Sequence, residues 1–177
     1  MVFLQRPKKK DMLLRRKKIY TIIAVVLLLL LYLSIFCFSA ADGESSSRTS
    51  NKVTELLLRL VYGVREGAAG QGINAYQVSN AEGIIRKIAH FLEYMGVGTL
   101  SYGIFIMWSY PVFKCGGWVL LQLFVSAVLD EIHQYFVPGR YASFRDVMID
   151  MAGGIVGMAL ILVWKGIREK WPIRLRK

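Results

Sequence analysis

The sequence has few cysteines, few histidines and few charged residues for its length of 177 residues. Its two cysteines, Cys37 and Cys115, lie far apart, each within or beside an apolar run. They provide neither a disulfide framework nor a Cys-x-x-Cys metal motif. The two histidines, His90 and His133, both occur where an apolar run meets charged residues. No internal repeat is evident, and the length permits one ordinary domain.

The composition is not that of an ordinary soluble domain. Charged residues make up 20% of the chain and hydrophobic residues 55%, and the mean hydropathy is +0.42. A net charge of +11 can indicate nucleic-acid binding, but the basic residues gather at the two ends, beside apolar runs. No stripe of aromatic residues alternates with them. These features predict a membrane protein whose partners are membrane lipids, and they argue against nucleic acid.

The fold class predicted is all-α, with four transmembrane helices. A helix that rises 1.5 Å per residue needs about twenty residues to cross roughly 30 Å of hydrocarbon. The runs of this length or close to it are residues 19–38, 87–110, 117–136 and 147–164. The first also resembles a signal peptide, because basic residues precede it and small residues follow it. It is longer than a usual signal-peptide core, so we expect it to be retained.

Two details predict how these helices pack. Only residues 111–116 separate the second and third spans, so these helices should be antiparallel neighbours. Gly153 and Gly157 are four positions apart in the fourth span, a spacing that lets helix backbones approach closely in lipid.

Basic residues near the span ends predict the orientation. Residues 1–18 carry eight Lys or Arg against one acid, and residues 165–177 carry six against one. Residues 39–86 carry five of each sign. Because cytoplasmic segments of membrane proteins are enriched in Lys and Arg, both termini should be cytoplasmic.

The predicted organisation therefore has five parts. In the segment between the first two spans, apolar residues from Val53 to Val64 recur at helical spacing and predict an amphipathic helix on the outer surface. The parts are a basic cytoplasmic N-terminus (1–18), a first span (19–38), an extracytoplasmic linker with the amphipathic helix (39–86), a core of three spans (87–164) and a basic cytoplasmic tail (165–177).

This topology gathers polar residues at the outer ends of three helices. The residues concerned are Lys87, His90, Glu93 and Tyr94 in the second span, Asp130, Glu131, His133 and Gln134 in the third, Arg140 in the loop, and Asp146 and Asp150 in the fourth. Glu131 is rotated about 100° from Asp130, so it should face a different neighbour. Ionisable residues at membrane depth are costly unless they are paired or hydrated, so they are candidates for a functional site.

The same residues carry a family resemblance. The segments "RKIAHFLEYMGVG" (86–98) and "DEIHQYFVPGRYASFRDV" (130–147), with the Gly-rich helix that follows, resemble the VanZ-like family over residues 86–162. The resemblance implies a multi-pass protein of the bacterial plasma membrane. The family's namesake is associated with resistance to glycopeptide antibiotics, teicoplanin in particular. Those drugs bind lipid-linked cell-wall precursors outside the membrane, so the resemblance implies a phenotype but no specific reaction.

Two functional readings of the cluster compete. In the first, Lys87 and Arg140 bind a phosphate or carboxylate, and the site binds a lipid-linked cell-envelope precursor or a glycopeptide-type antibiotic. The other ligand-binding candidates are Tyr94, Glu131, Gln134, Asp146 and Asp150. In the second, His90-x-x-Glu93 and Asp130-x-x-His133 form the catalytic site of a hydrolase or transferase, with or without a metal. We favour binding, and the sequence identifies no cofactor and leaves a metal open.

Two further interpretations of the polar cluster require neither a bound ligand nor catalysis. The polar groups can simply hold the helix ends together, with Asp146 capping the fourth span through a Ser143-x-x-Asp146 box. A network this large exceeds what holding helices requires. An outward-facing imidazole beside acids also titrates near physiological pH, which fits a sensor, but no residue favours a sensor over binding.

Overall fold

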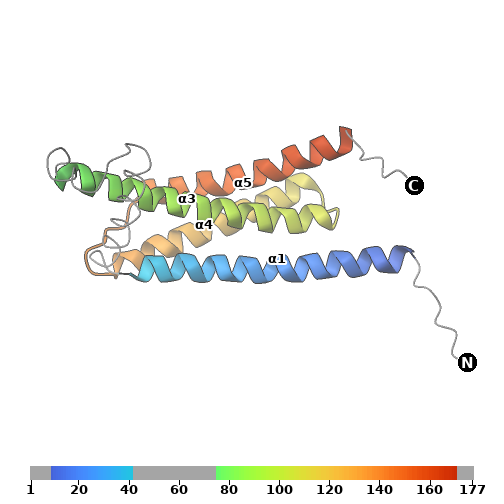
Figure 1. Cartoon of the computed structure of the whole chain (residues 1–177), viewed down its shortest axis with the longest axis horizontal. Helices are drawn as coiled ribbons and strands as arrows, with labels where there is room; N and C mark the ends of the chain where they lie inside the picture. The colour runs from blue at the N-terminus through green and yellow to red at the C-terminus, as the bar shows by residue number, and fades with distance from the viewer. Residues whose placement is uncertain (1–8, 42–74, 171–177) are drawn as a thin grey trace, which may run out of the picture.

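The structure is a computed structural model that describes residues 9–41 and 75–170 (Figure 1). Within these ranges the chain is all-α and contains no strand, which confirms the predicted class. The helices are α1 (Lys9–Ala40), α3 (Ala75–Met107), α4 (Val112–Tyr135) and α5 (Phe144–Lys170). The amphipathic helix predicted in the segment 53–64 lies outside the described residues.

Three of the described helices are long and apolar enough to cross a membrane: α1, α4 and α5. Their outward faces carry many exposed Leu, Ile, Val and Phe side chains, as expected of surfaces that contact lipid. Helix α3 has 33 residues, which is sufficient length. It does not belong to this apolar class, because polar residues such as His90 and Glu93 interrupt its apolar sequence.

Helix α3 packs most extensively against α5, through glycines. A Cβ atom added to Gly153 would collide with the backbone of Phe91, and one added to Gly157 would collide with the backbone of Met95. Gly98 of α3 meets the backbone of α5 in the same way. The predicted close approach at Gly153 and Gly157 is therefore confirmed, and it fixes the depth of α3 relative to α5.

The connection between α3 and α4 is shorter than predicted. Helix α4 already begins at Val112, so the residues that join the helices are 108–111. Ser109 adopts a left-handed conformation with φ of 63°, which reverses the chain tightly. The two helices are connected antiparallel, as expected.

Helix α1 lies along α3 and α4 and is held by polar contacts inside the bundle (Figure 1). Gln122 of α4 donates hydrogen bonds to the hydroxyls of Tyr32 on α1 and Ser101 on α3, each at 3.0 Å. Farther along, Ser34 of α1 donates to Glu93 of α3 at 2.7 Å. Because an unpaired polar group is costly in an apolar medium, these contacts define where α1 docks.

Candidate functional site

The polar residues of four helices gather at one end of the bundle. The C-terminal ends of α1 and α4 and the N-terminal end of α5 meet there, beside the first half of α3 (Figure 1). The first residue of α1 and the last residue of α5 lie at the opposite end. The turn that leads from α4 into α5 uses Gly139 with φ of 76°, a conformation that favours glycine.

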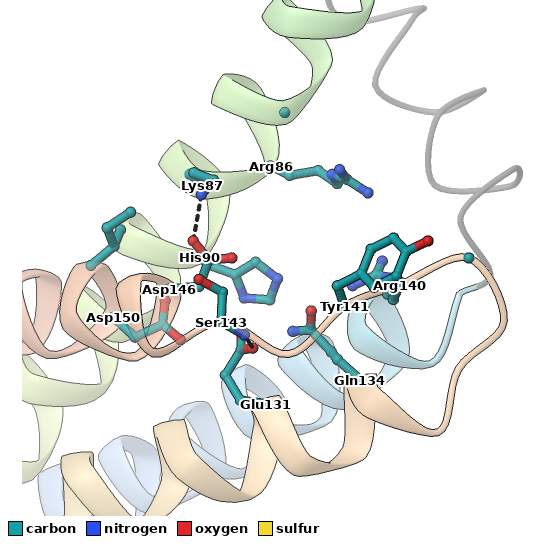
Figure 2. Close-up of a pocket in the computed structure, with 13 residues that line it drawn as sticks. Arg86, Lys87, His90, Glu131, Gln134, Arg140, Tyr141, Ser143, Asp146 and Asp150 are labelled. Atoms are coloured by element: carbon teal, nitrogen blue, oxygen red, sulfur yellow. Dashed lines mark hydrogen bonds and ion pairs between the residues drawn. The ribbon is translucent and has the colours of Figure 1, made fainter.

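A cavity of about 310 Å³ opens at this end (Figure 2). Its wall is built by α3, the end of α4, the following loop and the start of α5. The residues that line it are Gly83, Arg86, Lys87, His90, Glu131, Gln134, Gly139, Arg140, Tyr141, Ser143, Asp146, Ile149 and Asp150. Seven of the predicted site residues are among them.

Polar contacts hold this wall together. The Nζ of Lys87 on α3 pairs with Oδ1 of Asp146 on α5 at 2.5 Å. The backbone N–H of Ser143 donates to Glu131 of α4 at 2.6 Å. Asp146 therefore does not act as the predicted partner of a capping box, because Glu131 accepts the amide of Ser143 and Asp146 pairs with Lys87 instead.

Helix α1 supplies partners that the sequence analysis did not identify. Arg140 donates to the backbone carbonyl of Phe38 at 2.7 Å, and Gln134 donates to Ser39 at 3.3 Å. The ring of Phe36 stacks on the imidazole of His133 with centroids 4.8 Å apart. The hydroxyls of Ser34 and Ser39 were the available signal, since they interrupt or end an otherwise apolar run.

A second cavity of about 420 Å³ lies between α1, α3 and α4. Its lining is mainly apolar and aromatic: Tyr32, Ile35, Phe36, Tyr94, Ser126, Leu129, Asp130 and His133. Three predicted site residues, Tyr94, Asp130 and His133, thus face this cavity. Glu93 lines neither cavity and accepts the hydroxyl of Ser34.

The four predicted catalytic residues do not form a single group. His90 Nδ1 lies 3.7 Å from Glu93 Oε2, and His133 stacks against α1. The group that does converge contains His90, Asp130 and Asp150, whose ligand atoms all lie within 4.8 Å of one another. The spacing Asp130-x-x-His133 had suggested that His133 would lie in the same group as Asp130. In the structure Asp150 occupies that position beside Asp130 instead.

Glu131 and Asp130 face different neighbours, as their rotation on α4 implies. Glu131 points to the start of α5 through its contact with Ser143. Asp130 accepts a hydrogen bond from Gln134 at 2.7 Å and approaches His90 and Asp150. Both carboxylates are buried. The arrangement therefore offers charged and hydrogen-bonding groups to two separate spaces.

The profile described as VanZ/LLP1 matches residues 24–165, most of the chain. The chain belongs to the VanZ/LLP1 family. Membership of this family is associated with glycopeptide resistance. No curated protein and no solved structure matches the chain.

The extent of the VanZ/LLP1 match corrects the sequence analysis in one respect. The resemblance had covered residues 86–162, whereas the match begins at residue 24, inside α1. The structure supplies a physical reason, because α1 provides partners for Gln134, Arg140 and His133. Helix α1 is thus part of the family's unit.

Proposed function

We propose that this VanZ/LLP1 protein binds the anionic headgroup of a lipid-linked cell-envelope precursor in the first cavity, and that this binding contributes to glycopeptide resistance. In this proposal α3 is a fourth span, the chain is a multi-pass protein of the bacterial plasma membrane, and both termini are cytoplasmic. The basic segments 1–18 and 165–177 support this orientation. The cavity then opens to the extracytoplasmic side, where such precursors are exposed.

The observation that carries the proposal is the basic side of the cavity. Arg86, Arg140 and Tyr141 lie together on one side of His90, whereas Asp146 and Asp150 lie on the other (Figure 2). Arg86 has no ion-pair partner among the described side chains. A guanidinium can donate two parallel hydrogen bonds to a phosphate or a carboxylate, so this side suits an anionic group.

The dimensions and surroundings support a lipid-linked ligand. A cavity of about 310 Å³ falls at the lower end of the roughly 300–1,000 Å³ typical of small-ligand sites. The neighbouring second cavity has an apolar, aromatic lining and lies among the membrane-spanning helices. An isoprenoid chain would bury apolar surface there, while its phosphate remains in the first cavity. A glycopeptide-type antibiotic is the alternative ligand for this site.

Native mass spectrometry of the purified full chain, with and without added polyprenyl phosphate, tests this function. We expect wild-type protein to retain the lipid and Arg86→Gln to retain at least several-fold less. Arg145→Gln is the matched control, because Arg145 is exposed at the start of α5 and does not line the cavity. Equal retention by wild type and Arg86→Gln would refute binding on this basic side.

A second candidate function is hydrolysis or group transfer on the same class of lipid. The observation that favours it is an imidazole, His90, placed within 4.8 Å of two buried carboxylates. Such an imidazole can take a proton from an attacking water. Release of inorganic phosphate from a polyprenyl diphosphate, abolished by His90→Gln, would support catalysis. No release by folded wild-type protein would leave binding as the function.

A further inference from the structure

Three side chains from three helices converge between the two cavities: His90 and Asp150 line the first cavity, and Asp130 lines the second. His90 comes from α3, Asp130 from α4 and Asp150 from α5, and their ligand atoms lie within 4.8 Å of one another. Only 8% of Asp130 and 2% of Asp150 remain exposed. The glycine contacts and the Lys87–Asp146 pair fix α3 relative to α5, and the hydrogen bond from Ser143 to Glu131 joins α4 to the start of α5. The group is therefore set in a rigid frame.

The carboxylate of Asp150 is buried without a compensating partner. It lines the first cavity, and no hydrogen bond or ion pair to it occurs within residues 9–41 and 75–170. The Nδ1 atom of His90 is likewise buried and accepts or donates no hydrogen bond among the described residues. A buried carboxylate that lacks partners is destabilised in its charged form, so a cation that neutralises it would be strongly stabilising.

The surroundings add negative charge to this position. Four other carboxylates interact electrostatically with Asp150: Glu93, Asp130, Glu131 and Asp146. Of these, Asp146 alone forms an ion pair with a Lys or Arg among the described residues. Arg86 and Arg140 lie on the other side of His90 in the cavity (Figure 2). The acidic side thus has more carboxylates than basic side chains.

We propose that His90, Asp130 and Asp150 together bind one divalent transition-metal ion, Zn²⁺ or Mn²⁺. One imidazole and two carboxylates form a mixed donor set that suits these ions better than Ca²⁺, which takes six or more oxygen ligands. Metal–ligand distances of about 2.0–2.2 Å require the donor atoms to draw slightly closer than 4.8 Å, which small side-chain rotations achieve. Gln134, which donates to Asp130, orients one of the ligands.

This cation site is a second site beyond the proposed lipid-binding site, and a bound cation would also attract the phosphate of the lipid. Three protein ligands leave coordination positions open, and the first cavity provides access to them through His90 and Asp150. A phosphate oxygen could then bind the ion while the remaining oxygens face Arg86. This last step rests on the proposed function, whereas the metal site itself requires no lipid.

The metal site is tested on the purified full chain in detergent, stripped with EDTA and dialysed against Zn²⁺ or Mn²⁺. Elemental analysis should then find about one ion per wild-type chain and at least tenfold weaker retention for Asp150→Asn. Glu169→Gln is the matched control, since it removes one acid from the same helix at the far end, where Glu169 contacts Lys165. Equal retention by wild type and Asp150→Asn, or none by wild type, would overturn the proposal.

A measurement on the wild-type chain alone covers the case in which Asp150→Asn does not fold. Co²⁺ added to the stripped protein should show the visible absorption of a bound ion with nitrogen and oxygen ligands, and Zn²⁺ should displace it. A spectrum that remains that of aqueous Co²⁺ would contradict the site. Lipid retention by the EDTA-stripped protein is measured separately, so failure of the metal site and failure of lipid binding give different results.

Discussion

Lys87 of α3 and Asp146 of α5 form an ion pair across the wall of the first cavity, with Nζ 2.5 Å from Oδ1. Both side chains are partly exposed, at 41% and 29%. The pair joins the two helices whose glycines bring their backbones together farther along. It therefore holds Lys87 on the acidic side of the cavity, away from Arg86.

The Lys87–Asp146 pair should contribute modestly to stability. A double-mutant cycle with Lys87→Met and Asp146→Asn should give a coupling energy of about 0.5–1 kcal/mol, the range of partly exposed ion pairs. Reversible unfolding of the purified protein in mixed micelles measures it. A coupling energy near zero would show that the two residues act independently in solution.

The glycine contacts between α3 and α5 should be the most sensitive packing sites. Gly157→Leu should destabilise the protein by about 3 kcal/mol or more, because any side chain there collides with the backbone of Met95. Gly166→Ala is the matched control in the same helix, since a Cβ atom there meets nothing within 4 Å. Thermal unfolding of both variants checks the prediction, and similar unfolding temperatures would contradict it.

The hydrogen bond from Ser143 to Glu131 should protect the start of α5. Glu131→Met removes the acceptor and should speed amide exchange at Ser143 by about tenfold, equivalent to about 1.4 kcal/mol for this charge-assisted bond. Glu131→Gln keeps an acceptor oxygen and should have a smaller effect. Hydrogen–deuterium exchange at residue resolution measures both. Unchanged exchange in Glu131→Met would mean that the bond does not hold the helix start.

Gln122 should anchor α1 to the rest of the bundle. Gln122→Met removes the hydrogen bonds to Tyr32 and Ser101 while keeping the side-chain volume. Since hydrogen bonds between membrane helices contribute about 0.6 kcal/mol each on average, we expect a loss of about 1 kcal/mol. Leu121→Met, at an exposed neighbouring position, is the control. Equal stability of the two variants would argue against this anchoring role.

The proposed orientation predicts which end of the bundle is accessible from outside the cell. In a background with Cys37 and Cys115 replaced by Ser, Ala142→Cys should react with an impermeant thiol reagent on intact cells, because Ala142 is exposed in the loop beside the cavity. Glu169→Cys at the opposite end should react only after the membrane is permeabilised. The reverse pattern would invert the proposed topology.

Much of the fold could be predicted from the sequence, because membrane spans depend on local composition. The apolar runs identified helices that α1, α4 and α5 then occupy, and the spacing of Gly153 and Gly157 identified a close contact. Helix ends were less predictable. Helix α4 begins at Val112, five residues before the predicted start of its span, because a helix can continue through residues that the apolar run does not include.

The sequence predicted which residues belong to the candidate site, but it did not predict which of their side chains contact one another. The predicted topology placed His90, Asp130 and Asp150 near one level, because α3 and α5 begin at the same end of the bundle at which α4 ends. Rotation of each helix about its axis decides which side chains meet, and close packing at Gly153 and Gly157 sets that rotation for α5. For this reason only the tertiary structure joined Asp150 to His90, turned His133 onto Phe36, and gave α1 a share in the site.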